Sequence, residues 1–358
     1  MKRLLLLVMA ACEGPGMVAP AHDAAPIDAP AATRWVAYVG GYGPSIGWYG
    51  VDGTTGALAM RGSIPATAAS FLAWDAASTH LYAVDETNSR VVAFAIDPAT
   101  GALTRLNDQS SGGSGPAHVT VAGDRVLVAN YGDGTVSVLP IAADGSLQPA
   151  TQTVNAGAHA HEVVVHRGYA FVPCLGADYV AQYLWDGSML TPNAVPHMPT
   201  AAGAGPRHLV FTEVSPDAYL VDEVASTMMS LHVDDTTGRL TAVDTITTLP
   251  SGFTGQNTGA EILFRSGYVY ASNRGADDLV LFTLAGSGSP SPVAFTPSGG
   301  MTPRHFSMSP DGAWLFVANQ GSSTVVTFTV DPTSGIPRPT TQQIAATSPS
   351  FVGIAALP

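Results

Sequence analysis

A polar turn that recurs along the chain constrains the fold more than any other feature of the sequence. The copies are VDGTTGALAM (51–60), IDPATGALTR (96–105), IAADGSLQPA (141–150), LWDGSMLTPN (184–193), VDDTTGRLTA (233–242), LAGSGSPSPV (284–293) and VDPTSGIPRP (330–339). Their spacing of roughly 40–50 residues is the period of a β-propeller blade. The Asp, Gly, Thr and Ser residues in them are typical of turns, where glycine supplies a positive φ.

Short apolar runs fill the intervals between these turns. The pattern is an apolar run, a tight turn, a second run, Asn or Asp with Gly, and a third run, as in 118–141, 208–233 and 305–330. Alternation such as Val126 and Val128 against Leu127 and Ala129 has a period near two, which indicates strands. Each unit therefore supplies about four strands, which make one blade, and no segment predicts a helix.

Six units lie wholly inside the chain and the seventh is split between its ends. WVAYVGGY (35–42) and GWYGVDG (47–53) resemble later strands of a blade whose first strand is SFVGIAAL (350–357). Pairing the two ends in one blade removes exposed sheet edges, which invite aggregation. The sequence therefore predicts an all-β fold, a seven-bladed β-propeller over residues 34–358 with its ring closed by the terminal strands.

The N-terminal residues predict export. Residues 1–12, MKRLLLLVMAAC, place two cations before an apolar run that is too short to span a bilayer as a helix. The run Met9–Cys12 resembles a bacterial lipobox. We therefore expect a lipoprotein-type export signal at 1–11, a lipid on Cys12 and a flexible Ala- and Pro-rich tether at 12–33. The protein would be an envelope lipoprotein, its leaflet undetermined, or would be simply secreted.

Charge and cysteine content exclude several functions. The net charge of −13 disfavours nucleic acid and anionic membranes as partners, so we expect membrane contact only through Cys12. Lys2 is the only lysine, so the predicted domain has none to act as a Schiff base or P-loop cation. Cys174 lies in the apolar run AFVPCLG and reads as a buried, unreactive thiol.

A set of motifs follows the repeats in a fixed order. They are AHAHEVVV (158–165), GPRHLVF (205–211), LVDEVAST (220–227), LPSGFTGQNTGAEI (249–262), YASNRGADDLVLF (270–282) and TPRHFSMSPDG (302–312). Together they closely resemble the bacterial 6-phosphogluconolactonase and carboxy-muconate cyclase family, over roughly residues 35–358. The resemblance implies a seven-bladed propeller that opens or closes a lactone, and we expect no cofactor.

The resemblance also implies the site residues. Those that match the family motifs are His161, Arg207, Glu223 and Arg274, which come from three successive blades. His159 is the alternative to His161. Asp222 stands where the family usually has Asn, and its charge would raise the pKa of Glu223 or face solvent. Arg304 and His208 are further candidates for substrate binding, and His208 and His305 could each orient the arginine before them.

These residue types suit lactone chemistry. Attack on an ester carbonyl develops negative charge on oxygen, which fixed guanidinium groups stabilise. We therefore assign Arg207 and Arg274 to anion binding, and either Glu223 or His161 to the base. The expected substrate is a small anionic or sugar-derived lactone. The substrate's identity, the reaction direction and the oligomeric state stay open.

Two other interpretations compete with this one. Glu223, Glu261, Asn130 and Asn273 could form an oxygen cage for Ca²⁺, although no metal-binding loop is present and we expect no metal. Asn130, Asn273 and Asn319 recur at one blade position, which favours a structural role. Alternatively, the protein is an exported, non-enzymatic propeller that binds a ligand or partner, because propellers serve many functions.

Overall fold

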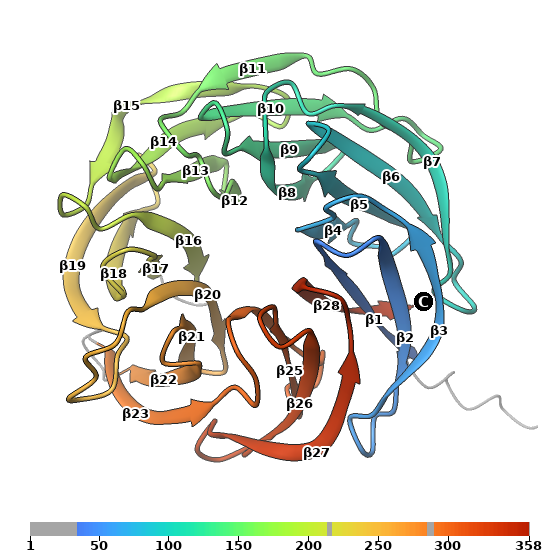
Figure 1. Cartoon of the computed structure of the whole chain (residues 1–358). Coiled ribbons are helices and arrows are strands. Elements are labelled where there is room, and N and C mark those ends of the chain that lie inside the picture. Colours follow the sequence, from blue (N-terminus) through green and yellow to red (C-terminus); the bar gives the residue numbers. More distant parts are fainter. Residues whose placement is uncertain (1–33, 213–216, 285–289, 358) are drawn as a thin grey trace, which may run out of the picture. The chain divides into compact units, whose positions relative to one another are not determined.

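Twenty-eight strands and no helix occur in residues 34–212, 217–284 and 290–357, the part of the chain that the computed structural model describes. The strands form seven four-stranded antiparallel sheets arranged around a common centre (Figure 1). The predicted all-β, seven-bladed propeller is therefore confirmed. The predicted export signal (1–11), Cys12 and the tether (12–33) lie outside the described residues. No helix long and apolar enough to cross a membrane is found in the described part.

The strands are divided among the blades as follows. The closing blade holds β28 (Pro349–Leu357), β1 (Arg34–Gly41), β2 (Ser45–Val51) and β3 (Leu58–Pro65). The next holds β4 (Leu72–Trp74), β5 (His80–Asp85), β6 (Arg90–Ile96) and β7 (Leu103–Ser110). The third holds β8 (Pro116–Ala122), β9 (Arg125–Asn130), β10 (Thr135–Pro140) and β11 (Gln152–Asn155). The fourth holds β12 (Val164–His166), β13 (Tyr169–Cys174), β14 (Tyr179–Trp185) and β15 (Leu190–Pro199).

The last three blades repeat the same order. One holds β16 (Pro206–Phe211), β17 (Asp217–Asp222), β18 (Thr227–Asp234) and β19 (Arg239–Thr247). The next holds β20 (Thr258–Arg265), β21 (Tyr268–Arg274), β22 (Asp278–Leu284) and β23 (Pro290–Pro297). The last holds β24 (Pro303–Met308), β25 (Trp314–Asn319), β26 (Thr324–Val330) and β27 (Pro337–Ala345).

The two ends of the propeller pair in one sheet, as the sequence predicts. β28 runs antiparallel to β1, with Trp35 opposite Ala356 and Tyr38 opposite Gly353. The first residues of the propeller thus hydrogen-bond to its last ones. This pairing closes the ring and places β1 between β28 and β2, so that both edges of β1 are paired.

The recurring turn joins neighbouring blades. In its second copy, the Asp97 carboxylate accepts the backbone N–H groups of Ala99 and Thr100, and Gly101 takes a φ of 76°. The Gly101 carbonyl then accepts the buried hydroxyl of Tyr38 from the preceding blade, at 2.9 Å. Tyr82 and Tyr270 make the same contact with Gly145 and Gly335. In these three copies the turn therefore hydrogen-bonds to the blade before it.

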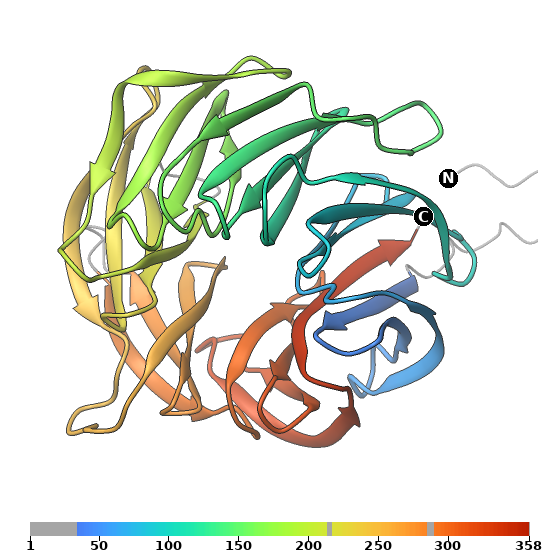
Figure 2. The ribbon, with the colours of Figure 1, turned by 45° about the horizontal axis from the view of Figure 1, so that its top comes forward.

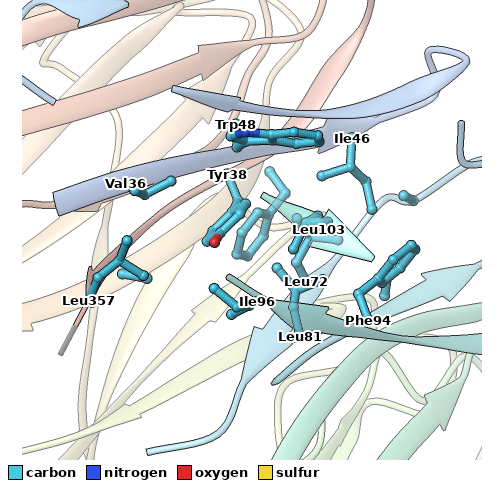
Figure 3. Close-up of a cluster of buried hydrophobic side chains, with 14 residues drawn as sticks. Val36, Tyr38, Ile46, Trp48, Leu72, Leu81, Phe94, Ile96, Leu103 and Leu357 are labelled. Atoms are coloured by element: carbon cyan, nitrogen blue, oxygen red, sulfur yellow. The ribbon is translucent and has the colours of Figure 1, made fainter. Parts of the chain in front are cut away.

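The hydrophobic core lies between blades rather than at the centre. Figure 3 shows one such cluster, in which Tyr38 and Trp48 of the closing blade pack against Leu72, Leu81 and Phe94 of the next. Comparable clusters separate the other blades. Because the blades pack against each other through their faces, only the inner strands lie around the centre of the ring. Among these, β4, β8, β12, β16, β20 and β28 lie nearest the centre in Figures 1 and 2.

Candidate active site

β-Bulges at the start of the inner strands turn polar side chains into the central channel. In β16, Pro206 lies opposite Asp222 and His208 opposite Val221, so Arg207 is an extra residue. The same shift occurs in β24 between Pro303 and His305, around Arg304. A bulge bends a strand and re-aims the side chain of its extra residue. Two of the predicted arginines therefore owe their positions to these bulges.

Arg207, Glu223 and Arg274, predicted from distant segments, meet in one group. Arg207 lies on β16, Glu223 directly follows β17, and Arg274 is the last residue of β21. Nη1 of Arg207 and Nη2 of Arg274 both contact Oε2 of Glu223, the latter at 3.0 Å. The Arg207 side chain is only 4% exposed, and its Nε donates to the Ala260 carbonyl at 3.0 Å. One carboxylate therefore fixes two guanidinium groups from adjacent blades.

The two arginines determine the charge state of Glu223. Burial alone would raise the pKa of its carboxyl, but Arg207 and Arg274 outweigh burial and hold that pKa below its usual range. The expected effect of Asp222 is wrong in both of its forms. Asp222 is buried, accepts a hydrogen bond from the Thr227 hydroxyl, and has its own pKa raised by burial to about 6. It faces away from solvent and does not raise the pKa of Glu223.

His161 contacts the same nitrogen of Arg207 that Glu223 contacts. Its Nε2 lies 2.7 Å from Nη1 of Arg207. Because a guanidinium can only donate, Nε2 must accept and the imidazole is neutral, with its proton on Nδ1. Burial, followed by the charge of Arg207, lowers the pKa of His161 well below its usual range. While this contact lasts, Nε2 of His161 is occupied, so the ring orients Arg207 rather than taking a proton there. His159 is exposed and stacks on Tyr131, with ring centroids 4.3 Å apart.

Arg304 lies at the rim of this group. It is half-buried, its Nη2 donates to the Tyr42 hydroxyl at 3.3 Å, and its guanidinium lies 5.6 Å from the centre of the Tyr42 ring. The Tyr42 hydroxyl in turn donates to Glu86 at 2.8 Å. Because Arg207 and Arg274 share one carboxylate, the three arginines leave this end of the channel with an excess of positive charge. The site therefore suits an anionic or carbonyl-bearing ligand.

A second group of buried titratable residues adjoins the arginines. The sequence reasoning named His208, His305 and Glu261 separately but did not predict that they form one group. Glu261 contacts both His208 and His305, and the carboxylate of Glu162 lies 3.8 Å from His118. A small hollow of about 10 Å³, enough for about one water molecule, joins the two groups, with His161, Arg207, His208, Glu261, Arg304 and His305 among the residues in its wall. One signal could have revealed the second group, because His118, His208 and His305 each end a Pro-x-His segment at the start of an inner strand.

The predicted rival, a metal cage, lacks support in these contacts. The amides of Asn130 and Asn273 donate to the backbone carbonyls of Ser111 and Thr248, as their predicted structural role requires. Within the described ranges, no group of three or more His, Cys, Asp or Glu residues is arranged to hold a metal ion. The expectation of a metal-free site stays a prediction. Cys174 is buried, as predicted.

Comparison with known proteins agrees with this fold. The family described as "Lactonase, 7-bladed beta-propeller" matches residues 36–354. The 6-phosphogluconolactonase of Bacillus subtilis is 32% identical over 329 residues, covering 85% of this chain and 93% of its own. The 6-phosphogluconolactonase of Pectobacterium carotovorum is 30% identical, covering 78% of this chain and 85% of its own.

One solved structure is similar to this chain over the whole propeller. The periplasmic gluconolactonase of Pseudomonas aeruginosa superposes with a TM-score of 0.84 at 30% identity, covering 91% of this chain and all of its own. The family match extends from β1 to β28 and includes every blade that contributes to the arginine group. The chain therefore belongs to the lactonase family of seven-bladed β-propellers.

Proposed function

We propose that the protein is an exported lactonase that hydrolyses the ring ester of a small sugar-acid lactone. The observation that carries the proposal is the bridge from Glu223 to both Arg207 and Arg274, with Arg304 at the rim. This arrangement holds guanidinium groups in fixed positions at the wall of a polar hollow. Fixed donors cost no reorganisation when charge develops on a substrate oxygen, which is why they favour the transition state over the ground state.

The reaction consumes one water. The water oxygen bonds to the lactone carbonyl carbon, its proton passes to a base, and the carbonyl electrons move onto oxygen beside the guanidiniums. Collapse of this intermediate breaks the ring C–O bond, and the leaving alkoxide takes up the proton, giving a hydroxy acid. Arg207 and Arg274 would stabilise the oxyanion, while Arg304 and His208 would contact the substrate. Glu223 and His161, the base candidates from the sequence, both contact Arg207.

The expected substrate is an unphosphorylated lactone. The relatives' names refer both to phosphogluconolactone and to gluconolactone, and the neighbour named for gluconolactone is periplasmic. The predicted export signal favours the second case, because phosphorylated sugars are scarce outside the cytoplasm. The Glu223 carboxylate offsets part of the arginine charge, so the site is less suited to a phosphate dianion than three unpaired arginines would be.

A hydrolysis screen tests the proposal. The full chain is assayed by titrating released acid from gluconolactone, phosphogluconolactone and a homoserine lactone, above the uncatalysed rate, with and without a chelator. We expect turnover that is fastest on gluconolactone and insensitive to the chelator. The absence of turnover on all three would refute the enzyme and favour the binding-module alternative. Loss of turnover with the chelator would refute a site made of protein groups alone.

A further inference from the structure

Glu261 is surrounded by N–H donors deep in the channel. Its Oε1 accepts the backbone N–H of Ile262 at 3.0 Å, and its Oε2 lies 3.4 Å from Nε2 of His305. Nδ1 of His208 lies 3.2 Å from both oxygens. None of these contacts is needed to hold the arginine bridge, and the side chain is buried. A buried carboxylate that is surrounded by N–H donors is stabilised as a hydrogen-bond acceptor.

The contacts fix the position of the proton on each imidazole. Nδ1 of His305 lies 3.4 Å from the backbone nitrogen of Val352, which can only donate, so His305 carries its proton on Nε2 and points it at Glu261. Glu261 therefore receives two N–H groups and accepts a third from Nδ1 of His208. Nε2 of His208 is then left with a lone pair, and it has no hydrogen-bond partner among the described residues although it is buried.

His208 belongs to the wall of the same hollow as Arg207 and Arg304. His208 directly follows Arg207 in β16, and its ring centroid lies 5.0 Å from that of His161. A carboxylate that orients an imidazole through Nδ1 and leaves Nε2 for proton transfer is the arrangement by which hydrolytic enzymes prepare a histidine base.

We propose that His208 is the general base of the hydrolysis, with Glu261 as its positioning residue and His305 holding Glu261 in place. This inference rests on the proposed lactonase function. Nε2 of His208 takes the proton of the attacking water, the water oxygen bonds to the carbonyl carbon, and the resulting imidazolium returns the proton to the ring oxygen as the C–O bond breaks. The carboxylate of Glu261 stabilises the imidazolium between these two steps.

The other candidates are less suited to this role. The lone pair of His161 on Nε2 is occupied by Arg207, and Glu223 is held as an anion by two guanidiniums, which makes it a weak base. His208 instead pairs with one carboxylate and keeps its Nε2 without a partner among the described residues, although burial and the charge of Arg207 lower the pKa of its imidazole well below the usual range. The titratable groups around it, by element, are Arg207 of β16, His118 of β8, His161 and Glu162 before β12, Glu223 after β17, Glu261 of β20, Arg274 of β21, and Arg304 and His305 of β24.

Turnover by Glu261→Gln and His208→Gln gives the kinetic test, with the full chain and gluconolactone. We expect both variants to lose roughly 10²–10⁴-fold in kcat with little change in KM. Glu162→Gln is the matched control, because Glu162 is also buried and accepts a backbone N–H, that of Leu209, yet does not contact His208 through its carboxylate. Its kcat should stay within tenfold of the parent. Glu261→Gln or His208→Gln with kcat within tenfold of the parent would overturn the proposal.

The pH profile separates positioning from mere structural support. In the parent, kcat should fall at low pH as the His208–Glu261 pair takes up a proton with one apparent pKa. Without the carboxylate, the imidazolium loses its stabilising charge, so the acid limb of Glu261→Gln should move to lower pH. An unmoved limb would overturn the role of Glu261.

A spectroscopic measurement decides the tautomer independently of activity. In a ¹⁵N-histidine-labelled sample, assigned with His208→Gln, the parent should show His208 protonated on Nδ1 with Nε2 unprotonated at neutral pH. Protonation on Nε2 would overturn the proposal. If the parent hydrolyses no lactone, the proposed function fails by that result alone, and the spectrum still tests the Glu261–His208 arrangement.

Discussion

Replacing Asp222 by asparagine should stabilise the propeller at neutral and alkaline pH. Asp222 ends β17 and is 1% exposed. Its Oδ2 accepts the Thr227 hydroxyl at 2.8 Å, whereas its Oδ1 has no hydrogen-bond partner among the described residues. Burial raises the pKa of this carboxyl to about 6. Ionisation of this buried carboxyl therefore destabilises the native state, because one of its oxygens is neither exposed nor hydrogen-bonded by the described residues.

The size of the effect follows from the difference in pKa between the folded and unfolded chain. An unfolded aspartate has a pKa of about 3.9, and each unit of difference is worth about 1.36 kcal/mol. Because the folded pKa is the higher one, the penalty is absent below about pH 4 and complete above about pH 6. It amounts to roughly 3 kcal/mol at pH 8. With an unfolding entropy of ~2.1 cal/mol/K per residue, this corresponds to about 4 °C in Tm.

Equivalent positions in other blades show what the amide would gain. At the ends of their second strands, the amides of Asn130, Asn273 and Asn319 donate to carbonyl oxygens in the preceding connection, those of Ser111, Thr248 and Ser298. Thr200 occupies the corresponding place before β16, since its N–H bonds to Asp178 as that of Ser298 bonds to Asp277. Because the blades repeat this arrangement, the amide introduced at position 222 should donate a hydrogen bond to the Thr200 carbonyl.

Urea unfolding of Asp222→Asn at pH 4 and pH 8 provides the assay. The free energy of unfolding should rise by roughly 3 kcal/mol more at pH 8 than at pH 4. The new hydrogen bond contributes at both pH values, whereas removal of the Asp222 charge contributes only at pH 8. Asn319→Asp is the matched reverse substitution and should lose stability chiefly at pH 8. Equal gains at the two pH values, or no gain at pH 8, would refute the reasoning.

Three further predictions concern the site and the chain's two cysteines. Glu223→Gln and Arg274→Ala should each lower lactone turnover at least 10²-fold while the circular dichroism spectrum stays that of the parent, because the guanidinium bridge is broken; Arg338→Ala, which breaks an exposed pair, is the control, and retained turnover in both site variants would remove the assignment. Cys174 should resist thiol reagents at pH 8 in the folded protein and react after unfolding in urea, because burial raises the pKa of its thiol to about 12; rapid labelling of the native protein would contradict this. Cys12→Ser should move the protein from the membrane fraction to the soluble fraction and abolish incorporation of labelled fatty acid; a parent protein that is already soluble would favour simple secretion.

Sequence reasoning located the blades because the repeat is periodic along the chain. The Asp- and Gly-containing turn marks each outer connection, and the split blade follows from the strand-like residues 350–357 at one end and 35–42 at the other. Burial of single polar residues is harder to foresee. Nothing in the segment LVDEVAST distinguishes buried Asp222 from Glu223, whose charge is set by arginines of two blades.

The pairing of His208 with Glu261 could not be predicted from the sequence, for a more specific reason. In a regular strand successive side chains alternate between faces, so a period of two places Arg207 and His208 on opposite sides of β16. The extra residue between Pro206 and His208 breaks that alternation, and both side chains become buried at the channel. A similar shift between Gly259 and Ile262 surrounds Glu261 in β20. The site therefore depends on where the inner strands depart from regular pairing, and strand periodicity alone cannot reveal this.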